Sequence, residues 1–168
     1  ILEKEQEHFT FPHKLKNGEI RMVDVYSSPI HFNERTVLFS IIFDSTKREE
    51  AFNEIIHISY HDYLTGAYNR RFFEEEFERL NTKANFPITV VMGDVNGLKM
   101  INDTFGHLEG DKLLKDAVKR IGEGLRSVDV LARIGGDEFG IILPKTDESE
   151  ARDIVNRMKK RVITIEHG

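Results

Sequence analysis

The chain has 168 residues and a formal net charge of −5. This length allows one complete domain, or one domain and part of a second. We expect no nucleic-acid partner, because general binding of nucleic acids needs a basic face. The absence of cysteine excludes disulfides, thiolate metal sites and cysteine nucleophiles.

No segment predicts contact with a membrane. The longest apolar run, Val37 to Phe43, is far too short to cross a bilayer, and no signal peptide is visible. We therefore expect a cytoplasmic location. Because the first residue is not Met, we interpret the chain as a fragment excised from a longer protein.

Residues 1–46 are predicted to form β-strands. An Asn-Gly pair at residues 17–18 is a strong hairpin signal. The segments Ile20 to Ser28 and Thr36 to Phe43 are rich in Val, Ile, Phe and Tyr, which favour strands. Pro29 is expected to end the first of these two strands.

Residues 47–61 are predicted to form a helix with one apolar face. That face carries Phe52, Ile55, Ile56 and Ser59. A helix between two domains with such a stripe can be a dimer seam. It can equally pack against its own domain, and both interpretations stay open.

From residue 62 the pattern alternates between helix and strand. Asn69 is expected to cap a helix that ends near Leu80, with Phe73, Phe77 and Leu80 inward. After Pro87, a short buried strand is predicted from Ile88 to Met92.

A second long helix is predicted from Glu109 to Leu125, and a β-hairpin follows it. The expected core stripe of this helix is Leu113, Leu114, Ala117, Val118, Ile121 and Leu125. Asp147 and Glu150 form a capping-box pattern for a last helix to about Arg161. A strand is expected to begin at 162–165. This order of elements suggests an α/β sandwich with an antiparallel component.

The hairpin contains the most informative segment, Arg133 to Phe139. Two glycines precede two carboxylates, and apolar runs lie on both sides. Glycines allow positive φ angles at the tip and a close approach of a ligand to the backbone. Acidic residues just after such a tip suit a divalent metal that carries a nucleotide phosphate.

Asp94 follows the predicted strand 88–92 and is a further acidic residue that could bind the metal. If this strand pairs beside the hairpin, Asp94 and Asp137 meet at one edge of the sheet. Two carboxylates with a backbone carbonyl and phosphate oxygens suit Mg²⁺, a hard cation.

The segment after Asp94 has features of a nucleotide site. Gly97 to Lys99 lies where a strand gives way to a short helix, whose free N–H groups can hold phosphates. Lys99 adds a point charge for a transition state. Asn102 can donate and accept hydrogen bonds, as contact with a base edge requires.

Asp111 is expected in the first turn of the helix that begins near Glu109. Its carboxylate could accept hydrogen bonds from the N1–H and N2–H₂ groups of guanine. The other interpretation is an ordinary acidic residue that the helix dipole favours. His107, just before this helix, is interpreted as structural.

The order and spacing of these pieces resemble the GGDEF family, the diguanylate cyclases. The resemblance spans residues 62–168. Its motifs are Asp62 to Gly66 with Asn69, Arg70 and Arg71, then Asp94 to Asp103, Gly106-His107 with Gly110-Asp111, and Gly135 to Phe139. Residues 1–46 resemble the C-terminal half of a PAS sensor domain, through residues 19–21, 27–30 and 43–46.

The resemblance implies a palm-like nucleotidyl-cyclase α/β sandwich with a mixed sheet, preceded by antiparallel PAS strands and a linker helix. Its expected domains are 1–46, 47–61 and 62–168. It also implies condensation of two GTP molecules into cyclic di-GMP, with release of two pyrophosphates. Each subunit of a homodimer would present one GTP.

The resemblance further implies a metal site. Asp94, the Val95 carbonyl and Asp137 would hold Mg²⁺ or Mn²⁺. Glu138 would assist in metal binding or in deprotonation of the attacking hydroxyl.

The nucleotide contacts are implied in the same way. Gly97, Leu98 and Lys99 would contact phosphates, and Lys99 would stabilise the transition state. Asn102 and Asp111 would recognise guanine.

An inhibitory product site is also implied. Arg126 and Asp129 lie upstream of the hairpin where the family has an Arg-x-x-Asp motif. Arg126 could bind a phosphate or guanine edge of cyclic di-GMP, and Asp129 could pair with guanine. Charges at the end of a helix are the other interpretation.

The chain departs from the family pattern in three places. Asn96 stands where many relatives have Asp, and Leu98 replaces a common Phe. Family members continue past Gly168 with further strands and a basic pair that binds the triphosphate, so we expect that the fragment itself can be inactive.

Two other functions stay open. The domain could be a receptor for GTP or cyclic di-GMP through Arg126 and Asp129. Asn96 favours this receptor hypothesis, and the intact segment Gly135 to Phe139 disfavours it. The chain could also be a sensor-dimerisation fragment, which only the apolar face of helix 47–61 supports.

Overall fold

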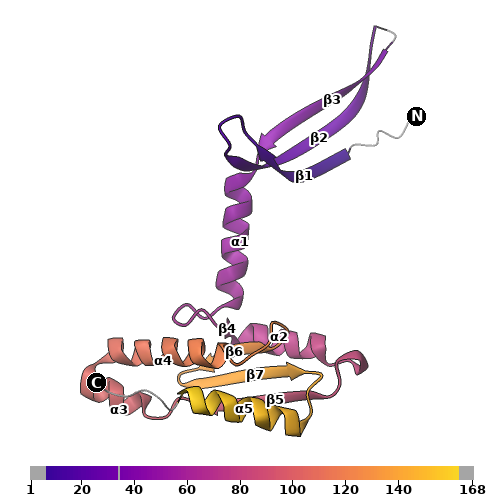
Figure 1. Ribbon diagram of the computed structural model, residues 1–168. Helices are drawn as coiled ribbons and strands as arrows, with labels where there is room; N and C mark the ends of the chain where they lie inside the picture. Colours follow the sequence, from indigo (N-terminus) through magenta and orange to yellow (C-terminus); the bar gives the residue numbers. More distant parts are fainter. Residues whose placement is uncertain (1–6, 34, 163–168) are drawn as a thin grey trace. The chain divides into compact units, whose positions relative to one another are not determined.

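The computed structural model describes residues 7–33 and 35–162 (Figure 1). The chain divides into two compact units, Ile1–His57 and Ile58–Gly168, and each is described by itself. No helix in the described ranges is long and apolar enough to span a membrane.

The first unit contains an antiparallel sheet in the order β1-β2-β3. Its strands are β1 (Glu7–Lys14), β2 (Ile20–Phe32) and β3 (Arg35–Asp44). The predicted Asn-Gly hairpin joins β1 to β2: Gly18 has φ of +88°, and its N–H donates to the Leu15 carbonyl at 2.9 Å. The positive φ explains why glycine follows Asn17.

The prediction that Pro29 ends a strand is wrong. β2 continues to Phe32, and Pro29 pairs with Leu38 of β3. Among the described residues, β1 pairs with β2 only as far as Ser27, so β2 has a neighbour on one side at Pro29. A strand with one free side accepts proline, because the missing N–H is not needed there.

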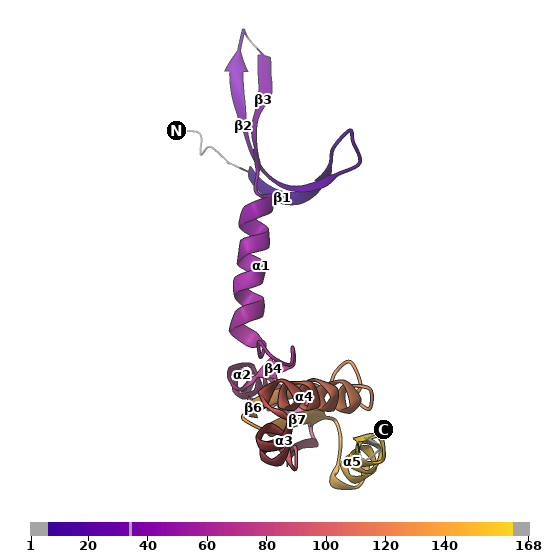
Figure 2. The same ribbon diagram turned by 90° about the vertical axis from the view of Figure 1, so that its left-hand side faces the viewer.

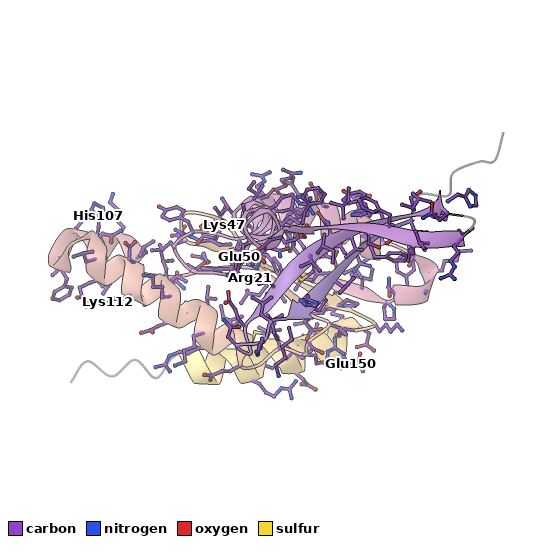
Figure 3. All side chains as sticks on the ribbon, turned by 90° about the horizontal axis from the view of Figure 1, so that it is seen from above. Arg21, Lys47, Glu50, His107, Lys112 and Glu150 are labelled. Carbon is purple, nitrogen blue, oxygen red and sulfur yellow. The ribbon has the colours of Figure 1, made fainter. Side chains whose placement is uncertain are left out.

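The predicted linker helix is present as α1 (Thr46–Tyr60), and none of its residues is buried. Its apolar face is open, with Phe52 57% and Ile55 65% exposed. At its first turn the Thr46 N–H donates to Asp44 Oδ1 at 3.0 Å, and Arg21 pairs with Asp44 at 2.6 Å. Figure 3 labels Arg21 and, on α1, Lys47 and Glu50.

The second unit is an α/β domain with a four-stranded mixed sheet. Its elements are β4 (Tyr68–Asn69), α2 (Arg70–Leu80), the 3-10 turn η1 (Lys83–Asn85), β5 (Ile88–Asp94), α3 (Leu98–Phe105), α4 (His107–Gly122), β6 (Val130–Gly135), β7 (Glu138–Pro144) and α5 (Glu148–Val162). The strand order is β4-β6-β7-β5, with β4 parallel to β6 and the other pairs antiparallel. This arrangement confirms the predicted α/β fold with a mixed sheet.

Successive residues of β7 point to opposite faces of the sheet and build two cores. Ile141 and Leu143 pack with α5, and Ile142 packs with α2. The strands β6 and β7 pair side by side (Figure 1), and Figure 2 shows the same elements turned by 90°. The central hairpin strands therefore lie in a well-packed frame.

Caps predicted from the sequence are present in the helices. Asn69 Oδ1 accepts from the Phe72 N–H at 3.0 Å and begins α2. Asp147 and Glu150 form the reciprocal capping box of α5, with distances of 2.9 and 3.1 Å. Glu150 is labelled on α5 in Figure 3.

Two boundaries differ from the predictions. α4 begins at His107 and ends at Gly122, rather than running from Glu109 to Leu125, because Gly106 with φ of +87° starts the helix directly after itself. Of its predicted core stripe, Leu114 and Ala117 are buried. The strand predicted at 162–165 lies outside the described residues, apart from Val162, which ends α5.

Strand β5 was predicted to be buried, and this is wrong. Val90 is 41% and Met92 57% exposed, and the strand continues two residues further, to Asp94. The reason is its position: among the described strands β5 pairs only with β7. Val91, which faces the α5 core, is the better-covered residue.

Candidate active site

The hairpin tip is a two-residue turn, Gly136 and Asp137, between β6 and β7. Gly136 has φ of +53°, as the first residue of a type II′ hairpin turn requires. Asp137 therefore lies within the turn, rather than after it as predicted, and Glu138 is the first residue of β7. Both carboxylates are held at one end of a central hairpin.

The register of β5 and β7 brings the other acid to the same place. Asp94 lies directly opposite Glu138, and the Val95 N–H donates to the Asp137 carbonyl at 3.0 Å. Directly opposed residues of two strands share one face of the sheet. The pairing on which the metal prediction depends is therefore present, and it gathers Asp94, Val95, Asp137 and Glu138.

The oxygen donors of this cluster suit a hard divalent cation. Within residues 7–33 and 35–162, no three or more His, Asp or Glu side chains converge as a complete metal site. Magnesium in nucleotide sites is typically held by one or two carboxylates, with phosphate oxygens and water completing the shell. The donor set therefore fits a metal that arrives with a nucleotide.

The turn into α3 offers backbone donors. Gly97 caps the helix with φ of +83°, and no side chain caps its first N–H groups. Leu98 is half-buried, and Lys99, the second helical residue, is exposed. An uncapped helix N-terminus with a nearby lysine suits phosphate oxygens.

The packing of α3 on α4 places Asn102 against Gly110, the residue before Asp111. A Cβ at Gly110 would overlap the Asn102 amide oxygen and lie 3.1 Å from Leu98 Cδ1. The Asn102 Oδ1 atom is buried and has no hydrogen-bond partner. An unsatisfied buried amide oxygen is costly in proteins, so the close packing of α3 on α4 at Gly110 carries an energetic cost at Asn102.

Asp111 is the fifth residue of α4, so its predicted place in the first turn is wrong. The helix begins two residues earlier than expected, and Glu109 is the acidic residue of the first turn. Because the dipole effect falls off within that turn, the helix dipole explains Asp111 less well. His107, the first residue of α4, is exposed (Figure 3).

Arg133 is a site residue to which the sequence analysis gave no role. Its Nε and Nη2 atoms donate to the Gly136 carbonyl at 2.9 and 2.7 Å. Its Nη1 atom lies 3.1 Å from Asp62 Oδ1. Nothing in the local pattern connects residues 62 and 133, because their contact depends on the folded sheet.

The Asp62 carboxylate accepts hydrogen bonds from Thr65 and from Arg133. Its Oδ1 accepts from the Thr65 N–H at 2.9 Å and from the Thr65 hydroxyl at 2.7 Å, besides Arg133. Burial acts to raise the pKa of Asp62, but the hydrogen bonds from Thr65 and Arg133 outweigh it and lower the pKa. The carboxylate is therefore ionised at neutral pH.

Arg126 and Asp129 form a closed turn between α4 and β6. The Arg126 Nη2 atom lies 2.7 Å from Asp129 Oδ1 and 2.7 Å from the Thr146 hydroxyl, and the Asp129 side chain is fully covered. Hydrogen bonding to Asp129 raises the pKa of Arg126. An open cavity of about 670 Å³ beside Arg126 is also lined by Glu150, Asp153 and Arg157.

The comparisons with known proteins identify the family of the chain. Residues 59–167 match the family described as diguanylate cyclase, GGDEF domain, and the chain belongs to that family. It is 36% identical to the uncharacterized protein YhcK of Bacillus subtilis over 126 residues, which cover 73% of this chain and 35% of YhcK. It is 28% identical to the diguanylate cyclase DgcM of Escherichia coli, over 92% of this chain and 38% of DgcM.

Solved structures show the same fold. Diguanylate cyclase SiaD of Pseudomonas aeruginosa, in complex with its activator SiaC, matches with a TM-score of 0.62 and 30% identity over 73% of this chain and 49% of that chain. The coiled coil and GGDEF domain of DgcB from Caulobacter crescentus, in complex with c-di-GMP, matches with a TM-score of 0.62 and 26% identity over 67% and 60%. The chain spans about a third of the length of YhcK and DgcM.

Proposed function

We propose that this protein condenses two GTP molecules into cyclic di-GMP and releases two pyrophosphates. In each half-reaction a 3′-hydroxyl attacks the α-phosphate of the other GTP, a P–O bond forms, the bond to pyrophosphate breaks, and the hydroxyl proton is lost. The observation that carries the proposal is the register that places Asp94 opposite Glu138, with Asp137 in the adjoining turn.

The acidic cluster would bind the metal and accept the proton of the attacking hydroxyl. Mg²⁺ or Mn²⁺, when bound, would polarise the phosphates and neutralise the pyrophosphate. Asp94, the Val95 carbonyl and Asp137 would be its protein ligands. Glu138 would assist them or accept the proton of the attacking hydroxyl.

The α3–α4 corner would hold the nucleotide. The N–H groups after Gly97 and the ammonium of Lys99 would bind phosphate oxygens, and Lys99 would stabilise the charge that develops in the transition state. The buried Asn102 amide, together with Asp111, would bind guanine. The carboxylate accepts from both guanine N–H groups, which favours guanine over adenine.

One site holds one GTP, so the reaction needs two copies of the domain. We propose a homodimer, with the open apolar face of α1 as its seam. We also propose that residues 1–46 are the C-terminal part of a PAS sensor, supported by their antiparallel sheet and by the direct passage of β3 into α1.

Turnover of the full-length protein tests this proposal. With GTP and Mg²⁺ under dimerising conditions, chromatography should detect cyclic di-GMP and pyrophosphate. Asp137→Ala and Lys99→Ala should each lower turnover at least 100-fold, whereas Arg152→Ala, on the exposed side of α5, should not. Absence of product from the unaltered protein, or full turnover of Asp137→Ala, would contradict it.

A product-binding site at Arg126 is a second proposal. The fully covered Asp129 fixes the guanidinium, and Arg157 lines the same cavity, so two cations could meet a phosphate. This site would give product inhibition in an enzyme, or define a receptor if turnover is absent. Calorimetry with cyclic di-GMP should show at least tenfold weaker binding for Arg126→Ala and unchanged binding for Asp137→Ala.

A further inference from the structure

Arg133, Asp62 and the Gly136 carbonyl form one connected group, here called the Arg133 clamp. Two guanidinium nitrogens of Arg133 contact the Gly136 carbonyl at 2.9 and 2.7 Å. The third contacts Asp62 at 3.1 Å. The side chains of Arg133 and Asp62 are 13% and 16% exposed, so this ion pair is largely shielded from water, whereas Gly136 is exposed.

The clamp acts on the peptide that carries Asp137. The Gly136 carbonyl belongs to the peptide bond between Gly136 and Asp137, so holding this oxygen fixes the plane of that peptide. Glycine by itself would let such a turn adopt several backbone conformations. The Val95 N–H holds the next carbonyl, that of Asp137, at 3.0 Å. The peptide planes on the two sides of Asp137 are therefore both held from outside the turn.

Asp62 in turn orients the guanidinium. Thr65 donates to Asp62 twice, at 2.9 and 2.7 Å, which leaves the carboxylate little freedom. A planar guanidinium can contact Asp62 and Gly136 together, whereas a lysine ammonium cannot reproduce this fork. Groups that orient the ligands of a metal typically contribute 10–100-fold to metal affinity or activity.

We infer that Arg133 and Asp62 are positioning residues that hold the turn Gly136-Asp137 in its metal-binding geometry. The inference rests on the proposed function for its catalytic consequence, because Asp137 is a proposed ligand. The clamp itself is a property of the chain without metal. The inference gives a structural role to Asp62 and Thr65, which lie far from the hairpin in the sequence.

The test compares Arg133→Lys and Asp62→Asn with Arg152→Lys as control, since Arg152 is an exposed arginine paired with Glu148 on α5. Two quantities are measured in the full-length protein: hydrogen exchange of amides 136–138 without metal, and the Mg²⁺ concentration that gives half-maximal turnover. Arg133→Lys should accelerate exchange about tenfold and raise the Mg²⁺ midpoint 10–100-fold. Excess Mg²⁺ should restore turnover, which a general loss of folding would not allow.

Unchanged exchange at 136–138 in Arg133→Lys, with an unchanged Mg²⁺ midpoint, would overturn the inference. If Asp62→Asn fails to fold, Arg133→Lys alone decides. If the unaltered protein makes no cyclic di-GMP, the proposed function fails and the exchange measurement decides on the clamp: acceleration supports it, and none overturns it. The Arg152→Lys control should match the unaltered protein throughout.

Discussion

Gly110 shows how a single residue controls the nucleotide corner. A methyl group there would overlap the Asn102 amide and crowd Leu98, so in Gly110→Ala the Asn102 side chain must leave its present position. Overpacking of this kind costs about 1–3 kcal/mol, which urea denaturation can measure. Gly122→Ala is the matched control: nothing lies within 4 Å of its added Cβ. It should stabilise the helix by up to about 1 kcal/mol. Equal stability of both variants would contradict the packing argument.

The lowered pKa of Asp62 predicts how its contribution to the stability of the fold depends on pH. Its folded pKa lies below the ordinary value, so its ion pair stabilises the fold above the ordinary pKa of about 4 and is lost as pH falls through the folded pKa. The stability advantage of the unaltered protein over Asp62→Asn should therefore be largest near neutral pH and shrink as the pH falls below the ordinary pKa of about 4. Urea midpoints at several pH values measure this, with Asp153→Asn, an exposed α5 carboxylate, as control. A stability advantage that grows as pH falls would show that folding raises the pKa of Asp62 and does not lower it.

At the scale of elements, Asn69 connects two helices. Its Oδ1 caps α2 at the Phe72 N–H, and its Nδ2 donates to the Ser59 carbonyl in the last turn of α1 at 2.8 Å. Asn69→Ala removes both contacts and should cost about 1 kcal/mol or somewhat more. Asn69→Asp keeps the cap acceptor and should retain most of that stability in urea denaturation. Equal losses in both variants would show that the cap contributes little.

The elements with strong local signals were predictable. The Asn69 cap, the Asp147–Glu150 box and the Asn17-Gly18 turn each depend on residues close in sequence, and all are present. The exposure of β5 was not predictable, because it depends on which strand lies beside it. The strand through Pro29 likewise depends on how far β1 extends.

The sequence marks the residues proposed for the candidate site, but it does not mark the residues that support them. The acids and glycines of the site are marked by their own types and spacing. Arg133 and Asp62 are not, because an arginine in a strand and an aspartate after a helix are common on any surface. The parallel pairing of β4 with β6, with Tyr68 opposite Ala132 and Asn69 opposite Arg133, brings the two segments together.

At the scale of the whole molecule, the division into two units predicts separate unfolding. Ile142 is fully buried between β7 and α2, so Ile142→Ala should cost about 2–5 kcal/mol in the unit from residue 58 onward. Calorimetry should show two transitions, with only one lowered by this change. Val23→Ala, at a buried position of β2, should lower the other. A single transition that moves as a whole in both variants would contradict independent units.

The proposed cyclase activity depends most on the convergence of Asp94 and Asp137 upon one metal ion. A crystal structure with a non-hydrolysable GTP analogue and Mn²⁺, located by its anomalous signal, measures this directly. We predict an ion bound by Asp94, the Val95 carbonyl and Asp137, with phosphate oxygens completing the shell. An ion bound elsewhere while nucleotide occupies the α3 turn, or carboxylates too far apart to share it, would contradict the proposed metal site.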